Sequence, residues 1–168
     1  MTYAESTDTS VDSSGIYVQD GTDGTLINSG TIVAEGIAES SASASGMYLS
    51  GGVNGTVINS GSIQVTSLSD EDEEAEGYGI YITGRRSGGL AGSVTNSGSI
   101  AVAAEGVSEA TAIGIYVGGG MTDDVSNTGT ITAYGIDQTS SADVYGMDIS
   151  GTVSGTVSNS GTITATGE

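Results

Sequence analysis

Apolar residues alternate with small polar residues along most of this chain, in short runs that recur at a nearly constant spacing. The first kind of run reads GIYV, GMYL, GIYI, GIYV and GMDI, and it begins at Gly15, Gly46, Gly79, Gly114 and Gly146. Its apolar positions are two residues apart, which is the period of a β-strand with one buried face. The pattern therefore predicts five strands, each with the residue between its two apolar positions on the outer face.

A second kind of run alternates with the first. It reads GTLINSGTI, GTVINSGSI, GSVTNSGSI, DDVSNTGTI and GTVSNSGTI, and it starts at Gly24, Gly55, Gly92, Asp123 and Gly155. Before its Asn-Ser-Gly or Asn-Thr-Gly corner, each copy offers one aliphatic residue that is expected to face inward, and another alternating strand follows the corner. We expect the corner glycine to adopt a positive φ, because only glycine does so at no steric cost. The corner glycines are Gly30, Gly61, Gly98, Gly129 and Gly161.

Together the two runs define five units, and successive units begin 31 to 35 residues apart. Three short strands cannot bury a core alone, so like strands of successive units must stack on one another. The sequence predicts an all-β fold, a right-handed parallel β-helix (β-solenoid) with five coils of three short strands each. A β-propeller has repeats of similar length, but each of its blades needs four strands.

The whole chain, 1–168, is predicted to form a single solenoid domain. The repeat units span approximately 11–41, 42–74, 75–109, 110–141 and 142–168, and residues 1–10 form an N-terminal tail or a partial unit.

Composition narrows the possible functions. The net charge is −19, from 21 acidic residues against only two basic ones, Arg85 and Arg86, and the chain has no histidine and no cysteine. Nucleic acid is not an expected partner without a basic footprint. Membrane insertion is not expected either, because no apolar run is long enough to cross a bilayer. The absence of lysine and histidine removes the usual general bases, so we expect a non-enzymatic protein.

Two columns of side chains are predicted to run along the stack. Stacked asparagines would form an amide ladder at the corner after the second strand, where their side chains can hydrogen-bond along the axis. Stacked tyrosines would line the outer face of the first strand, either stabilising the sheet or offering a contact surface for a glycan or a protein. The asparagines are Asn28, Asn59, Asn96, Asn127 and Asn159, and the tyrosines are Tyr17, Tyr48, Tyr81 and Tyr116.

An acidic run, SDEDEEAE over residues 69–76, lies in the longest loop between units. Asp70, Asp72 and Glu73 could hold Ca²⁺, since hard cations take carboxylate oxygens. The spacing matches neither an EF-hand loop nor the glycine-rich nonapeptide of calcium-binding β-rolls, and the pattern favours a solvated charge run over a calcium site. Apart from this possible calcium ion, the sequence predicts no cofactor.

The alternation of GIYV-like and GTVxNSGTI-like segments, from about Val11 to Gly167, resembles the passenger repeats of bacterial autotransporter (type V secreted) adhesins and of haemagglutinin-like right-handed β-helices. The resemblance implies an extracellular or cell-surface structural protein with adhesive properties. Its expected partners are a host or cell-surface glycan or protein. Open solenoid edges invite other strands, so neighbouring repeats or other copies of the chain are further expected partners. Head-to-tail stacking into an extracellular filament is the alternative function.

Overall fold

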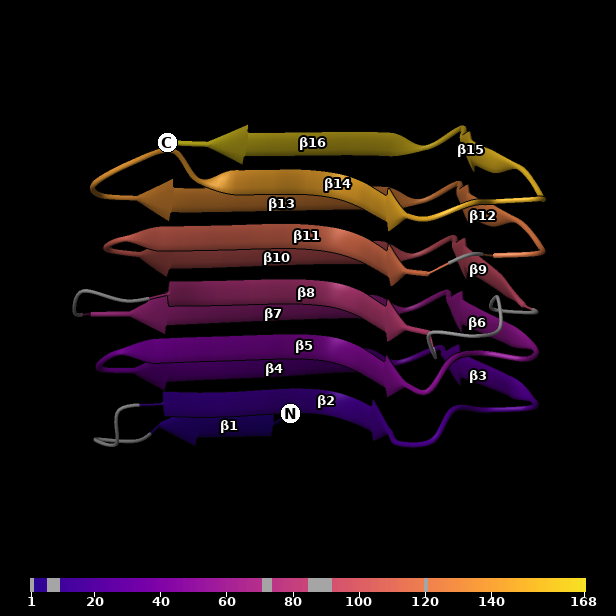
Figure 1. The fold of residues 1–168 in the computed structure, drawn as a ribbon, viewed down its shortest axis with the longest axis horizontal. Helices are drawn as coiled ribbons and strands as arrows, with labels where there is room; N and C mark the ends of the chain where they lie inside the picture. The colour runs from indigo at the N-terminus through magenta and orange to yellow at the C-terminus, as the bar shows by residue number, and fades with distance from the viewer. Residues whose placement is uncertain (1, 6–9, 71–73, 85–91, 120) are drawn as a thin grey trace.

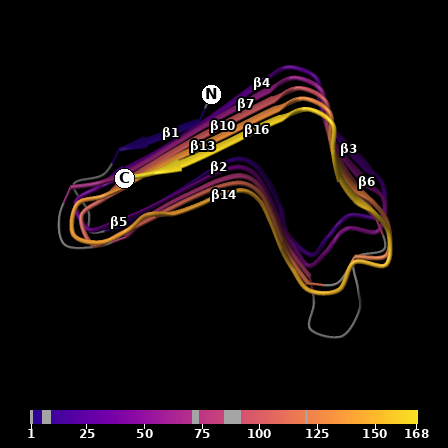
Figure 2. The ribbon, with the colours of Figure 1, turned by 90° about the horizontal axis from the view of Figure 1, so that it is seen from above.

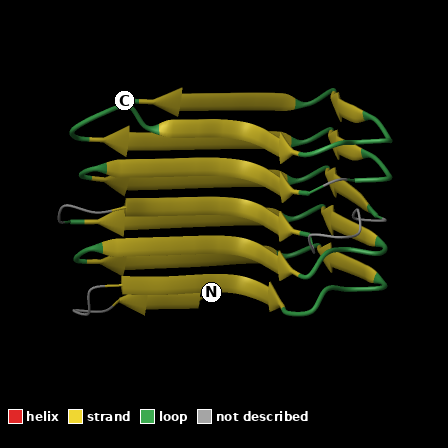
Figure 3. Ribbon diagram, viewed as in Figure 1, coloured by secondary structure: helices red, strands yellow, loops and turns green. Residues whose placement is uncertain are grey.

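The repeated strand patterns form a right-handed parallel β-solenoid (Figures 1 and 2). The computed structural model describes residues 2–5, 10–70, 74–84, 92–119 and 121–168. In these residues every regular element is a strand (Figure 3), and like strands of successive coils pair in parallel to form three sheets. The predicted all-β solenoid with three strands per coil is therefore confirmed.

The first sheet carries the GIYV-like segments, and its order along the stack is β14-β11-β8-β5-β2. Its strands are β2 (Ser10–Val18), β5 (Ser41–Ser50), β8 (Glu74–Thr83), β11 (Glu109–Gly118) and β14 (Asp143–Ser150).

The second sheet is short and ends at the asparagines. Its strands are β3 (Thr25–Asn28), β6 (Thr56–Asn59), β9 (Ser93–Asn96), β12 (Val125–Asn127) and β15 (Val157–Asn159).

The third sheet packs behind the first and contains one strand more (Figure 2). Its strands are β1 (Thr2–Glu5), β4 (Thr31–Ala38), β7 (Ser62–Ser69), β10 (Ser99–Gly106), β13 (Thr130–Asp137) and β16 (Thr162–Gly167). Thr2–Glu5 pairs with residues 34–37 of β4, so the N-terminal residues contribute a partial strand to this sheet.

The core consists of aliphatic columns that run parallel to the solenoid axis. Each column takes one side chain from each coil, and in the middle coils these side chains are fully buried. Representative members are Met47, Ile80 and Ile115 from the first sheet, Val57 and Val94 from the second, and Ile63, Ile100 and Ile131 from the third. Burial of each such side chain stabilises the fold by roughly 1.5–3 kcal/mol before the entropic cost of folding is counted.

The first sheet bends sharply within its strands, so its outer face is concave (Figure 2), and its pairing is interrupted at the motif glycine. The pairing of β2 with β5 runs from Ser14 opposite Ser45 directly to Ile16 opposite Met47, and it skips the glycine in both strands. A side chain at Gly46 would collide with the Ile63 side chain and would come within 2.6 Å of the Gly79 carbonyl oxygen. Glycine is therefore required at this position, and the bend of the sheet creates the hollow in which the candidate site lies.

The prediction of positive φ at the five corner glycines is wrong. In the described residues, positive φ occurs at other glycines, such as Gly21 and Gly51, and at Asp20. A Cβ on Gly61 would instead overlap the carbonyl oxygen of Gly30 in the coil beneath, and the same overlap recurs at Gly98 with Gly61. Successive coils approach so closely at this corner that no side chain fits between them, and glycine is required for that reason.

Candidate functional site: a groove lined by tyrosine and serine

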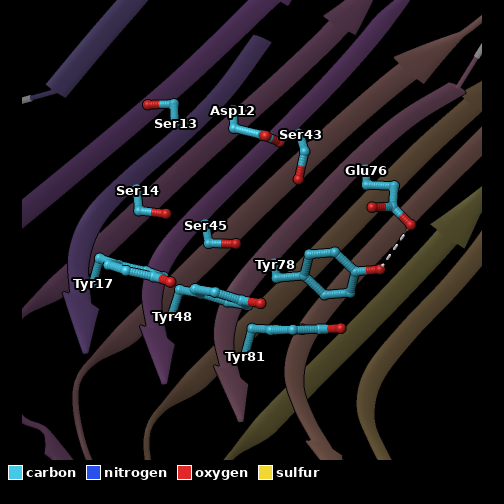
Figure 4. Close-up of a pocket in the computed structure, with 10 residues that line it drawn as sticks. All are labelled: Asp12, Ser13, Ser14, Tyr17, Ser43, Ser45, Tyr48, Glu76, Tyr78 and Tyr81. Carbon is cyan, nitrogen blue, oxygen red and sulfur yellow. Dashed lines mark hydrogen bonds between the residues drawn. The ribbon is translucent and has the colours of Figure 1, made fainter. Parts of the chain in front are cut away.

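A groove of about 470 Å³ lies in the hollow on the outer face of the first sheet, across the first three coils (Figure 4). Its volume is within the usual range of small-ligand sites. We call it the tyrosine groove. Its lining side chains are Asp12, Ser13, Ser14, Tyr17, Ser43, Ser45, Tyr48, Glu76, Tyr78 and Tyr81.

One wall of the groove is the predicted tyrosine stack. The ring centroids of Tyr17 and Tyr48 are 5.2 Å apart and those of Tyr48 and Tyr81 are 5.0 Å apart, with interplanar angles of 11° and 18°. Tyr116 continues the stack beyond the groove, 4.9 Å from Tyr81, and Asp148 follows Tyr116 in register. Because stacked rings cover each other's faces, this wall presents ring edges and hydroxyl groups to the groove.

The floor of the groove consists of serine side chains from the residues just before the motif glycine. Ser14 and Ser45 pair in register on β2 and β5. Ser45 is only 5% exposed, and its hydroxyl points into the groove without a hydrogen-bond partner among the described residues (Figure 4). No buried side-chain oxygen or nitrogen of the described residues lacks a partner, so this unpartnered hydroxyl is accessible at the surface of the groove. The Ser45 hydroxyl is therefore available to a ligand in the groove.

Tyr78 closes the groove at the third coil. It follows Ser14 and Ser45 in register, but its ring lies against Tyr81, with centroids 4.5 Å apart and planes tilted by 56°. The Tyr78 hydroxyl donates a hydrogen bond of 3.1 Å to Glu76 Oε1. Burial raises the pKa of Tyr78 well above its usual value, and the negative charge of Glu76 raises it further. Tyr78 is therefore a neutral hydrogen-bond donor over the whole physiological pH range.

The wall opposite the tyrosines is acidic. Asp12, Ser43 and Glu76 occupy one register position on β2, β5 and β8 and face the groove. The side chains that line the groove carry hydroxyl and carboxylate oxygens and no nitrogen atom. The site can thus accept many hydrogen bonds, and it concentrates negative charge at one wall.

The predicted asparagine ladder is present at the corner after the second sheet. Each Nδ2 donates to the Oδ1 of the next asparagine toward the C-terminus, at 2.7–2.8 Å. Asn59 and Asn96 are completely buried, and Asn59 Nδ2 also donates to the Ser99 carbonyl oxygen at 3.2 Å. The ladder links successive coils at this corner. All its hydrogen bonds are donated toward the C-terminal end of the stack, so the ladder is a structural feature with a defined direction.

The predicted calcium site falls largely outside the described residues. Asp70 follows β7 and is exposed, whereas Asp72 and Glu73 are not described. Arg85 and Arg86 also lie outside them. Within the described ranges, no group of three acidic side chains is placed to hold a metal ion.

Five residues of the groove were not among the site residues predicted from the sequence: Asp12, Ser14, Ser45, Glu76 and Tyr78. The signal that could have found them is the register: Ser14, Ser45 and Tyr78 each directly precede the motif glycine of their unit. An alignment of the five units on that glycine places them in one outward column beside the tyrosines. The column alone does not predict the hollow, which depends on the angle of the bend.

The chain matches no family model, no curated protein and no solved structure. None of the described segments forms a helix of the length and apolarity needed to span a bilayer.

Proposed function

We propose that this chain is a non-enzymatic structural and adhesive β-solenoid of a bacterial surface protein, located outside the cell, and that the tyrosine groove is its contact surface. The observation that carries the proposal is the open groove itself, with an aromatic wall on one side and the Ser45 hydroxyl accessible at its floor. Aromatic rings with polar tips are favoured at contact surfaces. The resemblance of the repeats to autotransporter passengers supports the location, and the lack of histidine and lysine supports the non-enzymatic role.

Binding of the labelled chain to bacterial and animal cells tests this proposal, with Tyr48→Ala as the main variant. Tyr48 is the middle ring of the groove wall, and its loss opens the stack between Tyr17 and Tyr81. Tyr134→Ala is the matched control, because Tyr134 lies on the third sheet away from the groove. We expect cell binding of Tyr48→Ala to fall at least about tenfold, as for a central aromatic contact. Equal binding by both folded variants would contradict the proposal.

The alternative, a filament of chains stacked head to tail, is favoured by the polarity of the asparagine ladder. At one end of the ladder Asn159 Nδ2 has no asparagine acceptor and donates to the Gly161 carbonyl oxygen, and at the other end Asn28 Oδ1 has no asparagine donor and accepts from the Gly30 amide. The two ends are therefore complementary only in the head-to-tail arrangement. Such stacking requires β1 to move. Thr2–Glu5 pairs with β4 at the positions where residues 165–168 of another copy would pair with it.

Engineered cysteines test the filament in the predicted register. Thr31 and Thr162 start β4 and β16, and in a head-to-tail stack they would lie about 4.8 Å apart in adjacent coils of two molecules. Within one molecule they are four coils apart, roughly 19 Å, which excludes an internal disulfide. We expect Thr31→Cys/Thr162→Cys to give disulfide-linked multimers, whereas Thr31→Cys/Thr130→Cys does not. Absence of multimers, with only monomers in light scattering across concentrations, would refute the filament.

A further inference from the structure

We propose that the tyrosine groove binds the lysine side chains of an extended basic segment of a partner polypeptide. This inference rests on the proposed adhesive function and specifies the chemistry of its ligand. It follows from the oxygen-only lining of the groove, the unpartnered Ser45 hydroxyl and the placement of Asp12, Glu76 and Tyr78.

The lining favours a ligand that brings hydrogen-bond donors. Every polar atom of the lining side chains is a hydroxyl or a carboxylate oxygen, and carboxylates only accept when ionised. A lysine ammonium group has three donors and no acceptor, so it can donate both to the carboxylates and to the hydroxyl oxygens of the lining. An anionic ligand such as a phosphate or a carboxylated sugar would meet Asp12 and Glu76 with like charge.

The groove also accommodates the apolar stem of lysine. The edges of Tyr17, Tyr48 and Tyr81 form one continuous wall along the solenoid axis (Figure 4). Lysine commonly lays its four-carbon stem on such apolar surface while its charged end remains with polar groups. The groove can thus bury the stem along the tyrosine edges and leave the ammonium group beside the oxygens of the floor and the acidic wall.

Tyr78 gives the groove a defined end. Its ring is tilted by 56° from Tyr81, and Figure 4 shows it face-on where the other three rings are edge-on. The face of an aromatic ring attracts a cation, whereas its edge does not. Because the Tyr78 hydroxyl donates a hydrogen bond to Glu76, the ring and the carboxylate lie next to each other, and one ammonium group can contact both. The neighbouring coils carry Ser45 and Ile113 at this register position, so the arrangement occurs once in the groove.

The two carboxylates set the spacing of the ligand. Asp12 and Glu76 are two coils apart, roughly 9.6 Å along the axis. Lysines at alternate positions of an extended peptide project on one side at intervals of about 7 Å, and their flexible stems can span the difference. The ligand is therefore an extended segment with lysine at every second residue. The net charge of −19 also attracts a basic segment over a longer range.

The test must separate binding in the groove from general attraction to an acidic protein. The probe is the peptide Gly-Lys-Gly-Lys-Gly-Lys, measured by isothermal titration calorimetry at 0.15 M salt, where long-range attraction is largely screened. The same peptide with acetylated lysines keeps the length and lacks the charge. The groove variant is Asp12→Asn/Glu76→Gln, and the matched control is Asp143→Asn/Asp148→Asn, which removes the same charge from the same sheet outside the groove.

We expect the groove variant to bind the lysine peptide at least about tenfold more weakly, and the control variant to change the affinity less than about threefold. Acetylation should abolish binding. Tyr78→Phe, which keeps the ring and frees the carboxylate of Glu76, should retain binding, whereas Tyr78→Ala should weaken it. Equal weakening in the two double variants, or binding of the acetylated peptide, would overturn the proposal.

The outcomes distinguish this inference from the proposed function. If the lysine peptide does not bind but Tyr48→Ala still reduces attachment to cells, the groove is a contact surface for a ligand of other chemistry and only the inference about lysine fails. If Tyr48→Ala leaves attachment unchanged, the proposed function itself fails, whatever the peptide does.

Discussion

Replacing Asn96 by alanine tests how much the asparagine ladder stabilises the solenoid. Asn96 is completely buried, accepts a hydrogen bond from Asn59 Nδ2 at 2.8 Å and donates one to Asn127 Oδ1 at 2.7 Å. The variant loses both. Asn59 Nδ2 retains the Ser99 carbonyl as an acceptor, so this bond costs about 1 kcal/mol. Asn127 Oδ1 loses its hydrogen-bond donor while buried, which costs roughly 1–3 kcal/mol. The expected loss of unfolding free energy is about 2–4 kcal/mol.

Urea unfolding followed by circular dichroism measures this loss. With an m-value of roughly 2 kcal/mol/M, the midpoint of Asn96→Ala should fall by about 1–2 M. Asn159→Ala is the matched control, since Asn159 is exposed at the end of the ladder and shares only one ladder bond, with Asn127. Its cost should remain below about 1 kcal/mol. If the interior and terminal variants lose the same stability, the ladder does not act through buried, mutually dependent hydrogen bonds and the reasoning is refuted.

Two further predictions concern the corner glycines and a loop carboxylate. Gly98→Ala should destabilise the fold by about 1–3 kcal/mol because its Cβ overlaps the Gly61 carbonyl oxygen, whereas Gly30→Ala, with open space around it, should be nearly neutral in the same urea assay. The Ser140 hydroxyl and the Thr139 amide donate to Asp137 and hold the pKa of Asp137 below its usual 3.8. The stabilisation of the fold by the ionised Asp137 carboxylate is therefore complete above pH 3.8, and it is lost as the pH falls through the lowered pKa. Thermal melting from pH 2 to 6 should show a smaller acid-dependent loss for Asp137→Asn, and superimposable profiles would contradict this.

The sequence predicts the columns of this fold because stacking repeats one register in every coil. The aliphatic columns, the asparagine ladder and the tyrosine stack all follow from positions that recur in each unit, and the structure contains all three. The local turn sequence predicted a positive φ at the corner glycines, whereas glycine is required there because successive coils approach closely. The separation of the coils depends on the whole stack and not on the local turn. The groove was missed for a similar reason, since it depends on the angle of the bend and on the tilt of the Tyr78 ring.

A regular column gives the same chemistry in every coil, so it can stabilise the solenoid but cannot select one ligand. Selectivity must come from positions where a column changes. In the column that directly precedes the motif glycine, Ser14 and Ser45 give way to Tyr78 at the third coil. Two small side chains leave space on the floor, and the large one closes it, which confines the groove to the first three coils. Tyr78→Ser would make this column uniform over those coils. It should open the groove at the third coil while leaving the core columns intact, so a loss of lysine-peptide binding without a loss of stability would show that recognition depends on this change of residue.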